Sequence, residues 1–112
     1  MGTRDEVLLG TLEHIVLLAV LRLGTEAYGA TIREEIEQRA GRAMSFGAVY
    51  VTLQRMESKG LVTSRLGEPT AERGGRAKRF FQVTAEGRRA VRRLQDVVGA
   101  MTKGLKEARG TA

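Results

Sequence analysis

Apolar residues recur at three- and four-residue steps in four segments of the chain, and these steps predict four helices. The first is expected over residues 9–23, with Thr11 as its N-cap and Gly24 as its stop. Leu17, Val20 and Leu21 extend its apolar face nearly all round, which predicts burial on several sides. The rest of that face holds Leu12, Ile15, Val16, Leu18, Ala19 and Leu23.

Two further helices follow within the first half of the chain. One is expected over about 27–40, with Ile32 and Ile36 on one stripe and Gly41 at its end. The other begins after Ser45, whose side chain can cap it, and stops at Gly60. Its buried face is predicted to hold Phe46, Val49, Tyr50, Leu53 and Met56.

The pattern then changes to the alternation of strands. Residues 61–66 alternate apolar and polar, residues 67–77 contain turn-forming Pro and Gly, and residues 79–83 read as a returning strand. Phe80 and Phe81 should therefore point to opposite faces of a hairpin. Thr84 can cap a last long helix with a heptad seam. That seam consists of Val91, Leu94, Val98, Met101 and Leu105.

This order of elements predicts a mainly α (α+β) fold, namely a winged helix-turn-helix domain followed by a long C-terminal helix. The net charge is unevenly distributed along the chain. The formal charge of the whole chain is +6, but residues 1–44 sum to −2 and residues 45–112 to +8. A basic half of this kind faces a polyanion or is simply a solvated surface, and charge alone leaves both interpretations open.

The outward face of the third helix is slim, which suits a major groove about 12 Å wide. Thr52 can exchange a hydrogen bond with a base or touch a thymine methyl, and Arg55 can reach a guanine edge or a phosphate. Tyr50 is more often a packed residue, although its hydroxyl can also reach DNA. The residues of this helix that we expect to face DNA are Ser45, Gly47, Ala48, Tyr50, Val51, Thr52 and Arg55.

The loop between the two strands is the candidate wing. Arg73, Arg76 and Lys78 concentrate positive charge, which would neutralise phosphates and make DNA affinity depend steeply on salt. Gly74 and Gly75 allow a tight turn and a close approach of the backbone to a groove. These five residues are the expected wing contacts.

Composition excludes several classes of site. The chain has no Cys, so it has neither disulfides nor thiolate chemistry. Its single His, His14, lies on an apolar helix and is more readily a packed or interface residue than a catalytic one. No nucleophile–base pair, metal-ligand spacing or glycine-rich nucleotide motif is present, so we expect no enzyme activity, no metal and no cofactor. The longest apolar run is far below the ~20 residues of a membrane span, which favours a cytoplasmic protein with no membrane partner.

Several runs of sequence resemble the PadR family of bacterial transcriptional regulators. They are 9–13 (LGTLE), 27–29 (AYG), 49–62 (VYVTLQRMESKGLV), 73–76 (RGGR) and 84–87 (TAEG). The resemblance covers about residues 9–105. One departure is Val51, where the family commonly has Pro after the Tyr of the third helix; a helix tolerates Val at that position.

The resemblance implies a homodimeric, sequence-specific DNA-binding regulator, usually a repressor, acting on double-stranded DNA at a pseudo-palindromic operator. It implies a division into a winged helix-turn-helix DNA-binding domain at 1–84 and a C-terminal dimerisation helix at 85–112. Some members release DNA when a planar ligand binds among aromatic residues; the last helix here has no aromatic residue, so an effector is possible but unsupported. The implied dimer contacts are Leu12, Val16, Val91, Leu94, Val98, Met101 and Leu105.

Two other functions stay open at the level of sequence. A winged helix can serve as a module for protein interaction or for RNA, because fold alone does not determine function. Comparing the binding of random duplex DNA, single strands and structured RNA would separate these from a DNA-binding regulator.

Overall fold

The structure is a computed structural model that describes residues 8–68 and 77–105. It confirms the predicted fold class, a mainly helical domain with one antiparallel two-stranded sheet. In chain order the elements are α1 (Thr11–Leu23), the 3-10 turn η2 (Gly24–Glu26), α2 (Gly29–Ala40), α3 (Phe46–Ser58), β1 (Val62–Leu66), β2 (Arg79–Val83) and α4 (Ala85–Thr102).

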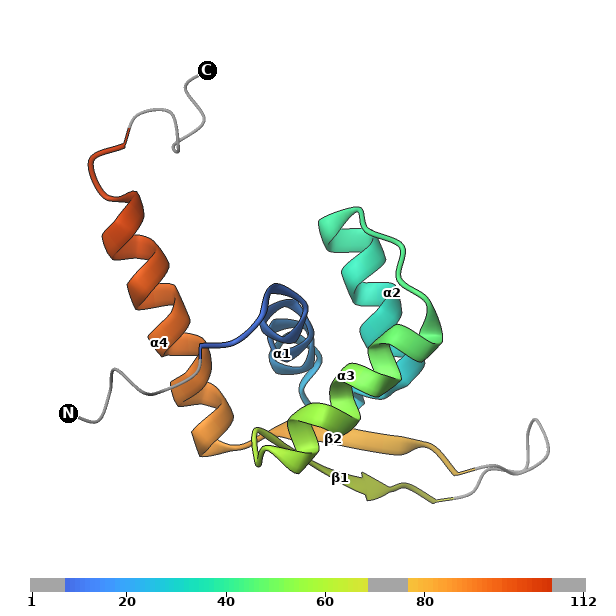
Figure 1. Cartoon of the computed structure of the whole chain (residues 1–112). Coiled ribbons are helices and arrows are strands. Elements are labelled where there is room, and N and C mark those ends of the chain that lie inside the picture. Colours follow the sequence, from blue (N-terminus) through green and yellow to red (C-terminus); the bar gives the residue numbers. More distant parts are fainter. Residues whose placement is uncertain (1–7, 69–76, 106–112) are drawn as a thin grey trace.

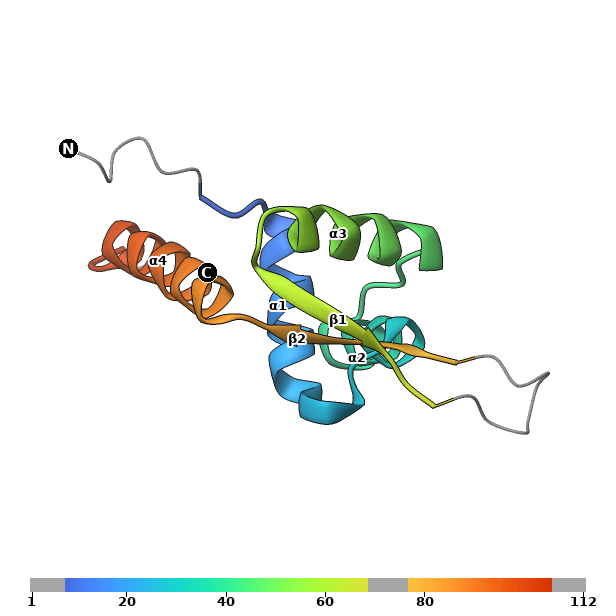
Figure 2. The same cartoon turned by 90° about the horizontal axis from the view of Figure 1, so that it is seen from below.

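Helix α1 lies at the centre of the molecule and contacts α2, α3, β2 and α4 (Figure 1). The β1–β2 hairpin runs beneath the helices in Figure 1, and Figure 2, seen from below, shows α4 leaving the end of β2 and pointing away from α2 and α3. The hairpin therefore has the connection between its strands at one end and the start of α4 at the other. This arrangement separates a compact winged helix-turn-helix unit from an extended helical arm.

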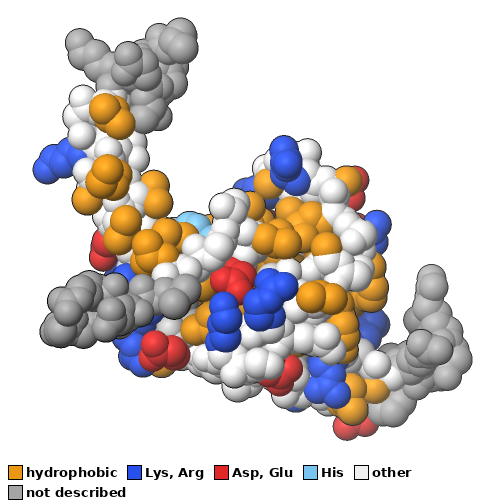
Figure 3. All heavy atoms as spheres, in the orientation of Figure 1, with side chains coloured by type: hydrophobic (Ala, Val, Ile, Leu, Met, Phe, Trp, Pro, Cys, Tyr) orange, Lys and Arg blue, Asp and Glu red, His pale blue; other side chains and the backbone are white. Residues whose placement is uncertain are grey.

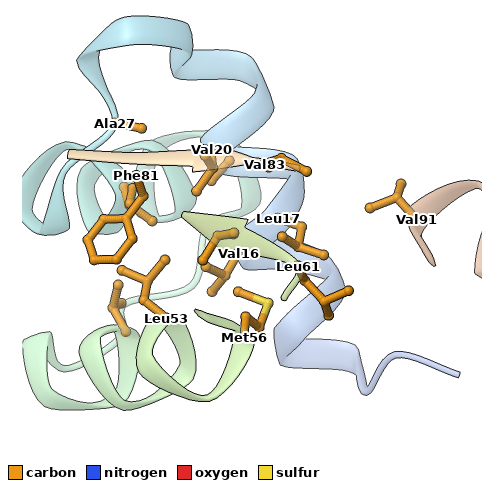
Figure 4. Close-up of a cluster of buried hydrophobic side chains, with 14 of the residues drawn as sticks. Val16, Leu17, Val20, Ala27, Leu53, Met56, Leu61, Phe81, Val83 and Val91 are labelled. Atoms are coloured by element: carbon orange, nitrogen blue, oxygen red, sulfur yellow. The ribbon is translucent and has the colours of Figure 1, made fainter. Parts of the chain in front are cut away.

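The core is almost entirely aliphatic, in keeping with an aromatic content of only 4% in the sequence. Leu17, Leu53 and Met56 have no exposed surface, and Phe81 is the one buried aromatic side chain among the described residues. Figure 4 shows these side chains converging from α1, α3 and β2, with Val91 of α4 approaching from one side. Each large apolar side chain buried in this way contributes about 1.5–3 kcal/mol.

Two predicted caps are confirmed. The Ser45 hydroxyl accepts a hydrogen bond from the Ala48 amide at 3.0 Å at the start of α3, and Thr84 does the same for the Gly87 amide at the start of α4. Such caps contribute about 1 kcal/mol each by satisfying an amide that has no partner within its own helix. After α3, Gly60 adopts a φ of +78°, which suits glycine, and the chain turns into β1.

The predicted starts of the first two helices are wrong. The N-cap of α1 is Gly10 rather than Thr11, because Glu13 turns back and accepts the Gly10 amide at 3.1 Å. Helix α2 begins at Gly29 rather than near Ala27, because the Thr31 hydroxyl holds the amide of Tyr28, its N-cap, at 3.0 Å. In both cases a side chain three residues into the segment decides where the helix begins.

The hairpin register pairs Val62 with Val83 and Arg65 with Phe80. Phe81 points into the core and Phe80 to the other face, as the alternation predicts. At the foot of α4, a Cβ on Gly87 would overlap the carbonyl oxygen of Leu61. Only glycine lets α4 start this close to the hairpin.

Candidate nucleic-acid interface

Helix α3 turns a continuous face away from the core. Gly47, Val51, Gln54 and Ser58 recur at four- and three-residue steps and are exposed, with 53% of Val51 accessible. The side chains on this face are short or medium in length, and none of the four carries a charge. A face of this shape fits the width of a major groove.

The prediction that Thr52 faces outward is wrong. Only 2% of Thr52 is exposed, and its hydroxyl donates to the Ala48 carbonyl at 2.8 Å. The threonine is buried because it lies one residue from Leu53 and four from Met56, within the face that packs on the core. It therefore supports α3 and has no free group to offer a base.

Phe46 was expected in the buried face of α3, and this prediction is also wrong. It is 52% exposed, and its ring stacks on that of Tyr50 with centroids 6.4 Å apart. It also covers Gly29, where an added Cβ would lie 2.9 Å from the ring. Phe46 thus seals the junction of α2 and α3 at the surface, and Tyr50 is half-buried beside it.

The other predicted DNA-facing residues of α3 differ in how far they are exposed. Ser45 and Gly47 are exposed, whereas Ala48 is half-buried. Arg55 lies on the edge of the outward face with half of its side chain exposed, and its NH1 is 3.9 Å from the Glu13 carboxylate. Ala48 and Arg55 therefore flank the outward face rather than form its centre.

A cluster of aromatic and basic side chains lies at the base of the wing. The rings of Tyr28 and Phe80 meet edge to face at 5.3 Å, and the two residues form a β-bridge. The Arg65 guanidinium lies 5.0 Å from the centroid of Phe80, and the Lys78 ammonium lies 5.1 Å from that of Tyr28. We call Tyr28, Arg65, Lys78 and Phe80 the wing-base cluster. It fixes two cations by cation–π contact beside the start of α2.

Hydrogen bonds also join the β1–β2 hairpin to α3. Arg79 donates to the Ser64 hydroxyl at 3.0 Å, and Ser64 donates to the Glu57 carboxylate at 2.8 Å. The hairpin and α3 are therefore joined by polar contacts as well as by the core. The remaining predicted wing residues, Arg73, Gly74, Gly75 and Arg76, lie outside the described residues.

The predicted dimer contacts divide into two groups. Val98, Met101 and Leu105 are exposed, by 52%, 74% and 49%, and Leu12 and Leu94 are half-buried. Hydrophobic side chains gather along the length of α4 in the space-filling view (Figure 3).

The prediction that Val16 and Val91 face a partner is wrong. Val16 is fully buried and Val91 is 6% exposed, because both belong to the protomer's own core. The first turns of α4 pack on the body of the domain, so its seam becomes free only after them.

His14 is half-buried on α1, and its Nε2 atom has no hydrogen-bond partner within the described part of the chain. Burial lowers the pKa of His14. No group of three His, Cys, Asp or Glu side chains that could hold a metal ion occurs among residues 8–68 and 77–105. None of the helices in these ranges is long and apolar enough to cross a membrane.

The sequence analysis did not identify two exposed residues of the candidate interface, Gln54 and Arg65. Gln54 occupies the middle of the outward face of α3, and the same spacing that groups Gly47 with Val51 could have identified it. Arg65 belongs to the wing-base cluster, and its place there depends on the register that pairs it with Phe80 across the hairpin.

The sequence pattern of the transcriptional regulator PadR-like family matches residues 17–93, which run from the middle of α1 into α4. The chain belongs to the PadR-like family. The resemblance seen in the sequence is thereby confirmed, and this family consists of transcriptional regulators rather than enzymes. A search of curated proteins gives no match.

Solved structures of PadR regulators share the fold. A PadR family transcriptional regulator from Eggerthella lenta is 23% identical, with 90% of this chain and 88% of that one covered and a TM-score of 0.66. One from Clostridium difficile is 22% identical, with 88% and 98% covered and a TM-score of 0.68. Bacillus subtilis PadR in complex with operator DNA is 18% identical, with 76% and 46% covered and a TM-score of 0.65. At these identities the likeness is one of fold.

Proposed function

We propose that this PadR-like regulator binds a pseudo-palindromic operator as a homodimer and represses transcription from it. The observation that carries the proposal is the outward face of α3, which is capped, uncharged and free of any role in the core. A helix presented in this way can lie in a major groove and read base edges. The operator complex of Bacillus subtilis PadR supports this assignment by fold.

The wing-base cluster gives further support to the proposed DNA-binding function. Arg65 and Lys78 are held beside aromatic rings near the start of α2, so less side-chain freedom is lost when they meet phosphates. The Arg73 and Arg76 side chains of the predicted wing would add further phosphate contacts. Base reading by α3 and phosphate contact by the wing are then separate tasks.

Dimerisation through the exposed part of α4 would double this interface. Residues 1–84 form the proposed DNA-binding domain, and residues 85–112 form the proposed dimerisation helix. Val98 and Met101 form part of a contiguous apolar stripe that is exposed to water. We propose that a second copy of the chain covers this stripe. A twofold dimer would set two α3 helices about one DNA turn apart, and the chain would act where bacterial DNA lies, in the cytoplasm.

Selection of bound fragments from random duplex DNA tests the proposal. We expect a pseudo-palindrome with half-sites about 10 bp apart, bound in preference to single strands and structured RNA. Arg73→Ala and Arg76→Ala should each weaken binding to all duplexes and reduce the salt slope by about one.

Two outcomes would count against it in different ways. Equal binding of duplex DNA and structured RNA would contradict the proposed function. Unchanged affinity of Arg76→Ala at moderate salt would contradict only the wing contact. Val51→Ala and Gln54→Ala serve as the complementary pair, since they should alter sequence preference rather than the salt slope.

A further inference from the structure

Glu13 is the one charged residue among those described that is buried, with 9% of its side chain exposed. Both of its oxygens are engaged. Oε1 accepts the Gly10 amide at 3.1 Å, and Oε2 accepts the Lys59 ammonium at 3.0 Å, with Arg55 NH1 at 3.9 Å from the same oxygen. A buried carboxylate with such partners is costly to leave unpaired, so its contacts hold their geometry.

The three side chains join the central helix of the domain, α1, to α3, the helix proposed to read DNA. Glu13 lies in the first turn of α1, whereas Arg55 and Lys59 lie in the last turn and at the C-cap of α3. The Glu13–Lys59 hydrogen bond spans 46 residues of sequence and, within the described part of the chain, is the one side-chain hydrogen bond between these helix ends. It joins the far end of the recognition helix to the central helix of the domain.

The charges are arranged to favour the ionised carboxylate. Burial raises the pKa of Glu13, but the hydrogen bonds from Gly10 and Lys59 and the charges of Lys59 and Arg55 outweigh it, and the pKa is lowered overall. Arg55 and Lys59 keep about half of their side chains exposed. Their outer surfaces therefore stay open to a phosphate while their inner surfaces meet Glu13.

We infer that Glu13 is a positioning residue for the recognition helix, setting the angle at which α3 meets DNA by holding Lys59 and Arg55 from behind. The inference rests on the proposed function. A positioning role affects the match between α3 and one particular sequence, whereas phosphate attraction acts on every duplex. The quantity that isolates it is the ratio of affinities for the selected operator and for random duplex.

The test compares Glu13→Gln, Lys59→Gln and the double variant with the full chain. Each single change should lower the ratio about tenfold, the size of effect expected for contacting residues in one network. The double variant should lose no more than the worse single variant, since both changes break the same link. Glu34→Gln is the matched control, because Glu34 is exposed on α2 and loses the same charge.

Each result has a definite meaning. A wild-type ratio of one would overturn the proposed function itself. A normal wild-type ratio that Glu13→Gln and Lys59→Gln leave unchanged would overturn the positioning role alone. Circular dichroism reports whether Glu13→Gln folds, and if it does not, Lys59→Gln decides, since its side chain is half exposed. Loss of both affinities in proportion to the unfolded fraction would show a purely structural role and would also overturn the inference.

Discussion

At the scale of single residues, polar side chains that turn back on their own backbone determine much of the local structure. Thr52 and Thr31 both bond to backbone groups within four residues, and each removes itself from the surface chemistry that its type suggests. Gly87 matters because it has no side chain, which allows α4 to pack directly against the Leu61 carbonyl. In the sequence, these threonines and this glycine cannot be told apart from others of their type. Only their surroundings in the folded chain distinguish them.

Glu13 makes stability depend on pH at this scale. Its pKa is lowered from 4.5 in the folded chain, so its contribution is present above about pH 4.5 and is lost as pH falls through the folded value. We expect Glu13→Gln to be less stable than wild type by about 1–2 kcal/mol at pH 7, because Gln keeps the shape and loses the charge. The half-exposed Lys59 keeps this figure modest.

Urea unfolding at a series of pH values measures the effect. The gap between wild type and Glu13→Gln should narrow as pH falls from 4.5 through the lowered folded pKa of Glu13, because the carboxylate then becomes protonated in both states. Glu35 and Glu86 also have lowered pKa values, from hydrogen bonds with Arg39 and Arg89. Because wild type and Glu13→Gln both contain these two residues, their titration cancels in the difference between the two proteins. A gap that stays constant with pH would contradict the assignment.

At the scale of elements, patterns that depend on near neighbours were predictable and packing partners were not. The caps Ser45 and Thr84 and the opposed Phe80 and Phe81 follow from local spacing alone. Val91 continues a heptad seam in sequence, yet it is buried because α4 starts against its own domain. No periodicity within one helix reveals which of its turns meets which neighbour.

The wing-base cluster offers a test at this scale. Phe80→Ala should lower the free energy of unfolding by about 1–2 kcal/mol, because it removes the aromatic pair with Tyr28 and the cation–π contact with Arg65. It should also weaken binding to all duplexes alike, since Arg65 loses its ring contact and Tyr28, over which Lys78 lies, loses its aromatic neighbour. Phe80→Leu keeps most of the apolar volume and separates packing from ring contacts. If both variants bind DNA as wild type does, the cluster has no part in binding.

At the scale of the whole molecule, the winged helix-turn-helix unit and the arm of α4 differ in how complete they are. The unit encloses its own core, whereas α4 leaves Val97, Val98 and Met101 in water. The proposed dimer resolves this difference by supplying a second apolar surface.

Val98→Glu combined with Met101→Glu tests the dimer. Burying two carboxylates in the seam should raise the dissociation constant of the dimer at least about 100-fold, measured by analytical ultracentrifugation. Both side chains are exposed in the protomer, so its fold should survive. Ala100→Glu is the control, since helical spacing places Ala100 on the opposite side of α4. A double variant that still sediments as a dimer would exclude this seam.

The outward face of α3 has one more consequence, for how such a regulator can change. Gly47, Val51, Gln54 and Ser58 take no part in the core, so substitutions there cost little stability. The direction of α4 depends instead on the contact of Gly87 with Leu61. In the proposed dimer, the preferred bases and the distance between half-sites are therefore encoded by separate residues. One lineage could acquire a new target sequence through a few surface replacements while it keeps the spacing of its ancestor.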